Sequence, residues 1–150
     1  MRDIFVENFE SEPFMIAFKT YFCEISESER NWPMLFRQMN AEKDVTKAIM
    51  RLDGNTVVGF IMFCPIRLSC PFFTEEYGYI RELWVAPAHR RAGNGEQLME
   101  LSEQYFSDLG ISQIMLKAEP QAEGFYRKLG YAESTAAISE DGIMLSKTIR

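Results

Sequence analysis

The stretch PAHRRAGNGEQLM, residues 87–99, joins an apolar, strand-like run to a helical pattern. The first N–H groups of a helix have no partner inside it and lie at the positive end of its dipole, so a tight turn there can bind an anion. Gly93 and Gly95 remove Cβ atoms where such a ligand would approach, and Arg90 or Arg91 can add charge-assisted hydrogen bonds to phosphate oxygens. The stretch therefore predicts a pyrophosphate site. The alternative is a plain strand-to-helix turn with exposed arginines.

Two other phosphate-binding loops do not fit these residues. The dinucleotide fingerprint G-x-G-x-x-G needs a small residue at position 98, where the chain has Leu98. A P-loop ends in Gly-Lys-Ser/Thr, which GNGEQ lacks.

The strand before the turn, YIRELWVAP (79–87), does not keep a period of two, because the apolar phase slips between Ile80 and Leu83. A β-bulge near Glu82 would return Ile80, Leu83 and Val85 to one face, and bulges often occur beside functional sites. A strand buried on both faces needs no alternation and is the alternative. Both interpretations stay open at this stage.

Periodicity elsewhere predicts a mixed α/β chain with the order two helices, three-strand meander, helix, strand, helix, hairpin. Ser26 and Glu29 suggest a capping box for the second helix, where Pro33 fits only in a first turn. Gly110 and Gly130 stand where two later helices should end. The expected helices are 13–25, 26–44, 98–109 and 121–130; the expected strands are 46–52, 56–66, 77–87 and 111–118, followed by a hairpin over 131–150 that turns near 140–142.

Composition limits the possible functions. A chain of 150 residues fits one domain, 1–150. Its net charge of −6 argues against broad nucleic-acid binding, which needs a basic face. No apolar run approaches the roughly 18 residues of a membrane span, and the start lacks the apolar core of a signal peptide. We therefore expect a cytoplasmic protein with no membrane contact.

The metal-ligating residue types are sparse. Three scattered cysteines predict free thiols, with Cys64 and Cys70 as small buried side chains. His89 is the single histidine and there is no Cys-x-x-Cys, so we expect no metal site.

Three motifs in order resemble one family. Arg90-x-x-Gly93-x-Gly95 is similar to the acetyl-CoA signature Gln/Arg-x-x-Gly-x-Gly/Ala of the GNAT superfamily of N-acetyltransferases. The preceding IRELWVAP looks like that family's bulged fourth strand, and FYRKLGY (125–131) looks like its tyrosine-bearing C-terminal motif. The similarity covers residues 46–131.

The resemblance implies a mixed α/β fold: a central, mostly antiparallel sheet splayed between its fourth and fifth strands and flanked by about four helices. It implies that acetyl-CoA lies in the gap. The implied coenzyme contacts are the backbone of Leu83, Trp84 and Val85 for pantetheine and, for pyrophosphate, Arg90 with the amides of Arg91, Ala92, Gly93, Asn94, Gly95 and Glu96.

The resemblance also suggests roles in catalysis. An alkyl ammonium loses its proton near pH 10, so transfer needs a proton acceptor; Glu82, acting directly or through water, is the first candidate. Tyr126 is the candidate acid for the departing thiolate. The alternatives are an exposed or ion-paired glutamate and a core tyrosine. Glu119 stands where the family often has asparagine, and we assign it no role.

The expected function is acetyl transfer to a primary amine of a small molecule, peptide or protein, by direct transfer in a ternary complex. The alternatives are a non-catalytic acetyl-CoA-binding module and an unrelated phosphate-binding α/β protein. Dimers are common in the family, so a homodimer is a further expectation.

The N-terminal part of the chain offers two groups of candidate acceptor residues. Four aromatic residues form either a wall of the acceptor site or part of the core: Tyr21, Phe22, Trp32 and Phe36. Three glutamates either attract a cationic acceptor or are solvated: Glu24, Glu27 and Glu29.

Overall fold

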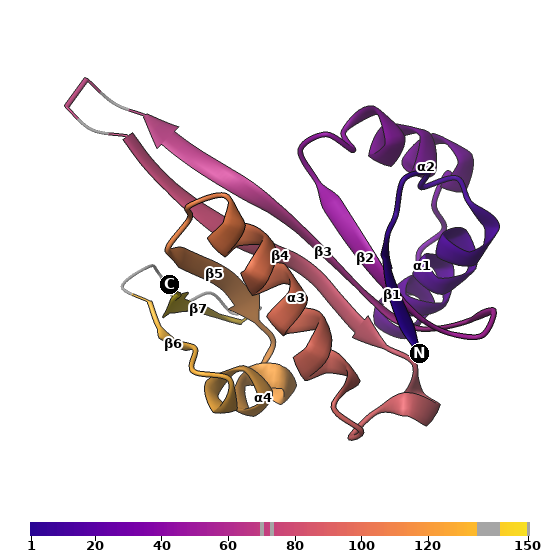
Figure 1. Cartoon of the computed structure of the whole chain (residues 1–150). Helices are drawn as coiled ribbons and strands as arrows, with labels where there is room; N and C mark the ends of the chain where they lie inside the picture. Colours follow the sequence, from indigo (N-terminus) through magenta and orange to yellow (C-terminus); the bar gives the residue numbers. More distant parts are fainter. Residues whose placement is uncertain (70, 73, 135–141, 150) are drawn as a thin grey trace. The chain divides into compact units, whose positions relative to one another are not determined.

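Among the residues that the structure describes, seven strands form one hydrogen-bonded sheet in the order β1-β2-β3-β4-β5-β7-β6. The computed structural model describes residues 1–69, 71–72, 74–134 and 142–149. The strands, seen in Figure 1, are β1 (Arg2–Phe5), β2 (Lys47–Asp53), β3 (Thr56–Ser69), β4 (Thr74–Val85), β5 (Gln113–Ala118), β6 (Ala132–Glu133) and β7 (Ile143–Thr148). The helices are α1 (Glu12–Ile25), α2 (Trp32–Ala41), α3 (Asn94–Asp108) and α4 (Glu123–Lys128), with 3-10 turns η1 (Pro87–His89) and η2 (Pro120–Ala122). Over these described ranges, the mixed α/β class with four α-helices is confirmed.

The chain forms two compact units. The first comprises Met1–Met62 and Glu82–Leu98, and the second comprises Phe63–Arg81 and Met99–Arg150. Strands β3 and β4 and helix α3 contribute residues to both. In the described part of the chain, no helix is both long and apolar enough to cross a membrane.

Aromatic side chains build the core of the first unit. The spacing of Phe14, Phe18, Phe22 and Ile25 predicts one apolar face for the helix expected over 13–25. Phe14 and Phe18 are buried as predicted, with exposures of 0% and 7%, whereas Ile25 is exposed. Phe14 meets Phe60 of β3 at 5.6 Å between ring centroids, and Phe18 meets Phe36 of α2 at 5.9 Å, both edge to face. Such pairs add roughly 0.5–1.5 kcal/mol beyond area burial. Aromatic packing thus fixes α1 against β3, and the position of α1 matters for the site.

The cap of α2 differs from the sequence prediction. The Asn31 side chain accepts a hydrogen bond from the Met34 amide at 3.2 Å, and Pro33 lies in the first turn as expected. The capping box assigned to Ser26 is wrong, because Ser26 ends α1 and its amide donates to the Phe22 carbonyl. Asparagine and serine are equally good caps, so composition alone did not choose between them.

Strand β1 was not predicted. It pairs antiparallel with β2, from Arg2 opposite Leu52 to Phe5 opposite Ile49. All four of its residues are exposed, so no buried face imposes an alternating pattern on the sequence.

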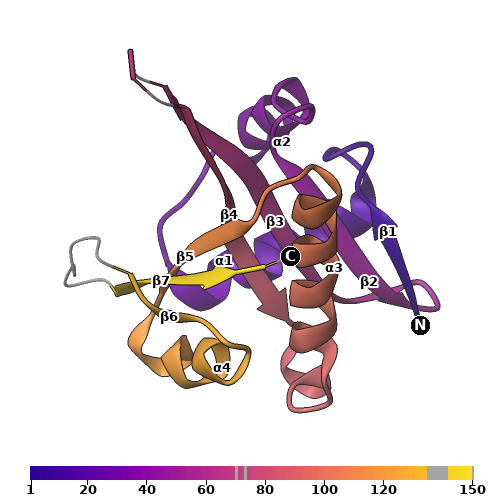
Figure 2. The same ribbon diagram turned by 60° about the vertical axis from the view of Figure 1, so that its left-hand side comes forward.

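The second unit contains the parallel part of the sheet. β4 pairs with β5 in parallel through Gly78–Ile114, Tyr79–Met115 and Ile80–Leu116. Figure 2 shows β7 between β5 and β6, and both of its ladders are antiparallel. The predicted turn of the final hairpin near 140–142 falls largely outside the described residues.

Left-handed glycines end two helices as the sequence predicts. Gly110 follows α3 with φ 80°, and Gly130 follows α4 with φ 98°. This conformation costs glycine little because it has no Cβ.

The bulge and the splay stay predictions. The register between β4 and β5 covers three residue pairs and ends at Ile80. Trp84 is buried and its neighbours Leu83 and Val85 are half-buried, so side chains on both faces of this end of β4 are covered. That burial favours the alternative explanation for the irregular apolar pattern.

Candidate functional site

The glycine-rich turn leads directly into the 15-residue helix α3. Arg91 and Gly93 have left-handed backbones, with φ 62° and 84°. The Gln97 amide donates to the Gly93 carbonyl at 3.0 Å, so Gly93 is the residue that caps the helix. The amides of Gly93, Asn94, Gly95 and Glu96 consequently precede the first intrahelical bond and are available to an anion.

Asn94 holds this turn in place from inside. Its side chain is 4% exposed and donates from Nδ2 to the His89 carbonyl at 2.9 Å. This bond ties the first residue of α3 to the end of η1. The backbone that presents the four amides is therefore fixed before any ligand arrives.

Arg90 contacts two parts of the protein. Its Nε donates to the Val85 carbonyl of β4 at 2.8 Å, and an Nη donates to Oε2 of Glu24, at the end of α1, at 2.9 Å. Its side chain remains about half exposed. Arg91 is exposed. Of the two arginines considered for phosphate, Arg90 is thus the one already bonded to β4 and α1.

Glu24 also contacts Trp84. The Trp84 Nε1 donates to the same Glu24 oxygen at 3.1 Å. One carboxylate of α1 therefore joins the end of β4 to the arginine that begins the signature. The glutamates near the end of α1 were considered as solvated or cation-attracting groups, and the structure gives this one a specific pair of partners.

The backbone groups of Leu83, Trp84 and Val85, the three predicted pantetheine contacts, do not all point to the same edge of β4. The Ala86 amide donates to the Val58 carbonyl of β3 at 2.8 Å. Because successive residues of a strand direct their backbone groups to opposite edges, Trp84 also faces β3, while Leu83 and Val85 face the other edge. With the Val85 carbonyl bound by Arg90, the Val85 amide and both groups of Leu83 are the polar groups directed to that edge.

Glu82 is half-buried and its side chain reaches α1, where the Tyr21 hydroxyl donates to its Oε2. It is therefore held in a defined position, two residues before Trp84 on the same strand. Sequence analysis identified Glu82 but not Tyr21 as its partner. The two are 61 residues apart, and no local pattern joins them.

Tyr126 lies in the second unit, on α4, and is half-buried. Its ring is 5.1 Å from that of Phe125 and 6.1 Å from that of Tyr131. Glu119 precedes η2, and its Oε2 accepts from the side-chain Nε2 of Gln121 at 2.7 Å. That bond occupies one oxygen of the residue that replaces the family's asparagine.

The cysteines that the structure describes are free. Cys64 is buried as predicted, and burial raises the pKa of its thiol; Cys23 is exposed. Cys70 lies outside the described residues. Within the described ranges, no three His, Cys, Asp or Glu side chains gather in a way that could hold a metal ion.

Comparison with known proteins identifies the family. The chain belongs to the acetyltransferase (GNAT) family, whose model matches residues 3–131. An acetyltransferase-like protein of Bacillus subtilis (strain 168) is 32% identical over 91 residues, which are 61% of this chain and 62% of that protein. The chain thus aligns with less than two thirds of that relative.

Solved structures show the same fold. An acetyltransferase from Clostridium acetobutylicum, crystallised with acetyl-CoA, has a TM-score of 0.76 at 15% identity. The alignment covers 92% of this chain and 94% of that protein. An aminoglycoside 6'-N-acetyltransferase complexed with coenzyme A has a TM-score of 0.72 at 17% identity, covering 98% and 97%. At these identities the likeness concerns the fold alone.

Proposed function

We propose that the protein is an acetyl-CoA-dependent N-acetyltransferase that moves an acetyl group to a primary amine by direct transfer in a ternary complex. The observation that carries this proposal is the turn before α3: a capping Gly93, held by the Asn94–His89 bond, leaves four amides ready for the coenzyme's diphosphate. Family membership supplies the class of reaction.

Backbone groups of β4 would bind the rest of the coenzyme arm. The Val85 amide and the backbone of Leu83 face the edge away from β3, where an extended amide-rich chain can add to them like a further strand. Arg91, which is exposed, is the charge that can approach the phosphates from the turn. Arg90 contributes by fixing the turn to Val85 and Glu24.

The proposed chemistry is nucleophilic attack of a neutral amine on the thioester carbonyl. Glu82, oriented by Tyr21, first takes a proton from the bound ammonium, directly or through water, and so gives the neutral amine that attacks. After the attack the nitrogen loses a second proton, which replaces the one that Tyr126 gives to the thiolate. The carbon–sulfur bond breaks, and the Tyr126 hydroxyl gives its proton to the leaving thiolate. The products are an amide and coenzyme A.

The proposal is tested by incubating the protein with acetyl-CoA and a panel of primary amines, following thiol release and the mass of the acetylated amine. We expect both products in equal amounts. A protein that binds acetyl-CoA and acetylates no amine is the non-catalytic module. Stabilisation by nucleotides but not by coenzyme A would instead indicate an unrelated phosphate-binding protein.

Two glycine variants provide a matched control for coenzyme binding. Gly93 and Gly110 both have φ near 80°, and an added Cβ would meet no atom within 4 Å at either position. Alanine therefore strains both backbones equally, at a cost of about 1 kcal/mol. We expect Gly93→Ala to weaken acetyl-CoA binding and Gly110→Ala, at the far end of α3, to leave it unchanged. If Gly93→Ala and Gly110→Ala bind acetyl-CoA with equal affinity, the coenzyme does not bind at the turn.

A further inference from the structure

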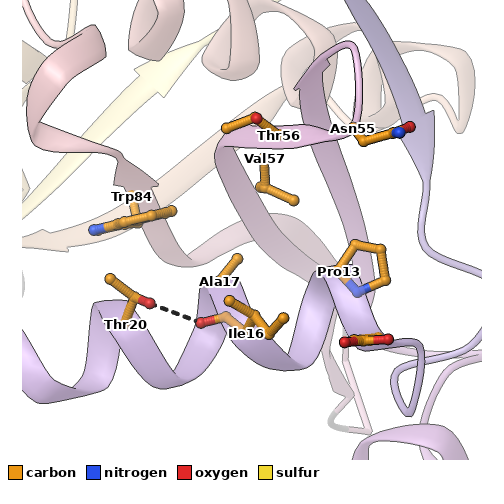
Figure 3. Close-up of a pocket in the computed structure, with 9 residues that line it drawn as sticks. Pro13, Ile16, Ala17, Thr20, Asn55, Thr56, Val57 and Trp84 are labelled. Atoms are coloured by element: carbon orange, nitrogen blue, oxygen red, sulfur yellow. Dashed lines mark hydrogen bonds between the residues drawn. The ribbon is translucent and has the colours of Figure 1, made fainter.

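The first unit contains a pocket of about 390 Å³ between α1, the start of β3 and Trp84. Figure 3 shows Ile16, Ala17 and Thr20 on the helix, Thr56 and Val57 opposite them, and the indole of Trp84 at one end. This volume lies in the range of roughly 300–1,000 Å³ that small-molecule sites occupy.

The walls of the pocket are mainly apolar, with few polar groups. The apolar wall residues are Pro13, Ile16, Ala17, Val57 and Trp84. The Thr20 hydroxyl donates to the Ile16 carbonyl at 2.8 Å, so its oxygen can still accept a hydrogen bond. Glu12 is the one charged residue in the lining. The lining thus holds a carboxylate, which attracts a cation, and no basic group that would repel an ammonium.

The pocket lies close to Glu82. The side chains of Glu82 and Trp84 both reach α1, through Tyr21 and Glu24. Residues two apart on a strand are separated by about 7 Å. On the helix, Thr20 of the lining is adjacent to Tyr21. A molecule held against Trp84 and Thr20 is therefore within reach of the group that we assign as proton acceptor.

We propose that this pocket holds the body of the acceptor, and that the acceptor is a small primary amine with an apolar, aliphatic or aromatic, body and its amino group directed toward Glu82. This inference rests on the proposed function and gives it a substrate class. An apolar body would bury the apolar walls away from water, and this burial is the main favourable contribution to binding that the pocket can provide. A polyamine or an aminoglycoside would bring more hydroxyl and ammonium groups than the four polar residues of the lining, Glu12, Thr20, Asn55 and Thr56, can bond.

The test compares two lysine variants at exposed apolar positions. Ile16 is 57% exposed and lines the pocket, whereas Met34 of α2 is 61% exposed and does not. Ile16→Lys and Met34→Lys add the same charge with similarly small effects on folding. Phenethylamine and hexylamine are the apolar probes, and ethanolamine and spermidine are the polar ones. KM is measured at saturating acetyl-CoA, and binding of phenethylamine is measured by calorimetry in the presence of coenzyme A.

We expect the apolar probes to have KM values at least about tenfold below those of the polar probes. Ile16→Lys should raise the KM and Kd of phenethylamine about tenfold, and Met34→Lys should leave both unchanged. A preference for the polar probes, or equal effects of the two variants, would overturn the inference while leaving acetyl transfer intact. If wild type binds phenethylamine without acetylating it, and Ile16→Lys no longer binds it, the result would support the pocket and contradict the proposed function. Absence of phenethylamine binding would overturn the inference whatever the turnover.

Discussion

Glu24, at the end of α1, and Arg90, the first residue of the glycine-rich signature, form an ion pair with an N–O distance of 2.9 Å. The arginine also bonds the Val85 carbonyl, and the carboxylate also accepts from Trp84. The signature arginine is therefore connected to the helix and strand that surround the proposed acceptor pocket. We therefore infer that in this chain Arg90 positions the turn.

Removing that pair should weaken coenzyme binding more than catalysis. We expect Glu24→Gln to raise the KM for acetyl-CoA about two- to fivefold, the effect of an exposed ion pair worth up to about 1 kcal/mol, with kcat nearly unchanged. Glu123→Gln, which breaks the similarly exposed Arg127–Glu123 pair of α4, is the control. The KM difference should shrink in high salt. Equal KM values for the two variants would show that the pair does not position the turn.

Glu82→Gln should slow transfer most at low pH. At high pH the amine is already neutral and needs no base, whereas at low pH the proton must be removed at the site. We expect kcat/KM to fall about a hundredfold near pH 7, with a smaller loss as the pH approaches 10. Glu76→Gln makes the same change at an exposed position of β4. A variant with the wild-type pH profile would remove Glu82 from the mechanism.

Tyr126→Phe should reduce turnover about a hundredfold while acetyl-CoA affinity stays within about twofold, because the hydroxyl acts on the leaving thiolate. Tyr131→Phe is the matched control, since its ring lies 6.1 Å from that of Tyr126. Single-turnover rates and coenzyme titration separate the two effects. Full turnover in Tyr126→Phe would leave this tyrosine a packing role.

Tyr131 makes the stability of the second unit sensitive to alkali. It is 2% exposed and donates to Glu103 at 3.2 Å, and Lys147 binds the other carboxylate oxygen at 2.8 Å. Burial first, and the Glu103 charge second, raise the pKa of the Tyr131 hydroxyl above its usual value. The folded state thus keeps a proton that the unfolded state releases above about pH 10. The stabilisation is complete below that pH and is lost as the pH rises further.

Urea unfolding of wild type and Tyr131→Phe at pH 7 and pH 11 measures this effect. Near neutrality the variant should be less stable by about 0.5–1.5 kcal/mol, the worth of the lost hydrogen bond. At pH 11 wild type should have lost up to about 1.4 kcal/mol relative to the variant, because one proton is linked to unfolding. A stability difference that stays constant or widens with pH would contradict a raised pKa.

Elements with a buried face were predictable, and elements without one were not. Phe14 and Phe18 reveal α1 because their spacing records the face packed against β3. Every residue of β1 is exposed, so its pairing with β2 leaves no pattern in the sequence. Trp32 stacks on Phe36 at 5.9 Å, so these two aromatic residues belong with core packing and not with an acceptor wall.

At the site, local motifs were predictable and distant partners were not. The positive φ of Gly93 follows from the need to enter α3 through a tight turn, which glycine allows. Glu24 and Arg90 are 66 residues apart. Because either residue could pair with any residue of opposite charge, the sequence does not indicate which partner it has. Only the packing of α1 against β3 brings them together.

The central claim is that the amides before α3 hold the coenzyme's diphosphate. Titrating ¹⁵N-labelled protein with acetyl-CoA, and following backbone amide shifts, tests it directly. The claim predicts the largest changes at Gly93, Asn94, Gly95 and Glu96, saturating together with one dissociation constant, while the Gly110 amide at the other end of the helix is unmoved. Unchanged signals from those four amides at saturating acetyl-CoA would contradict it.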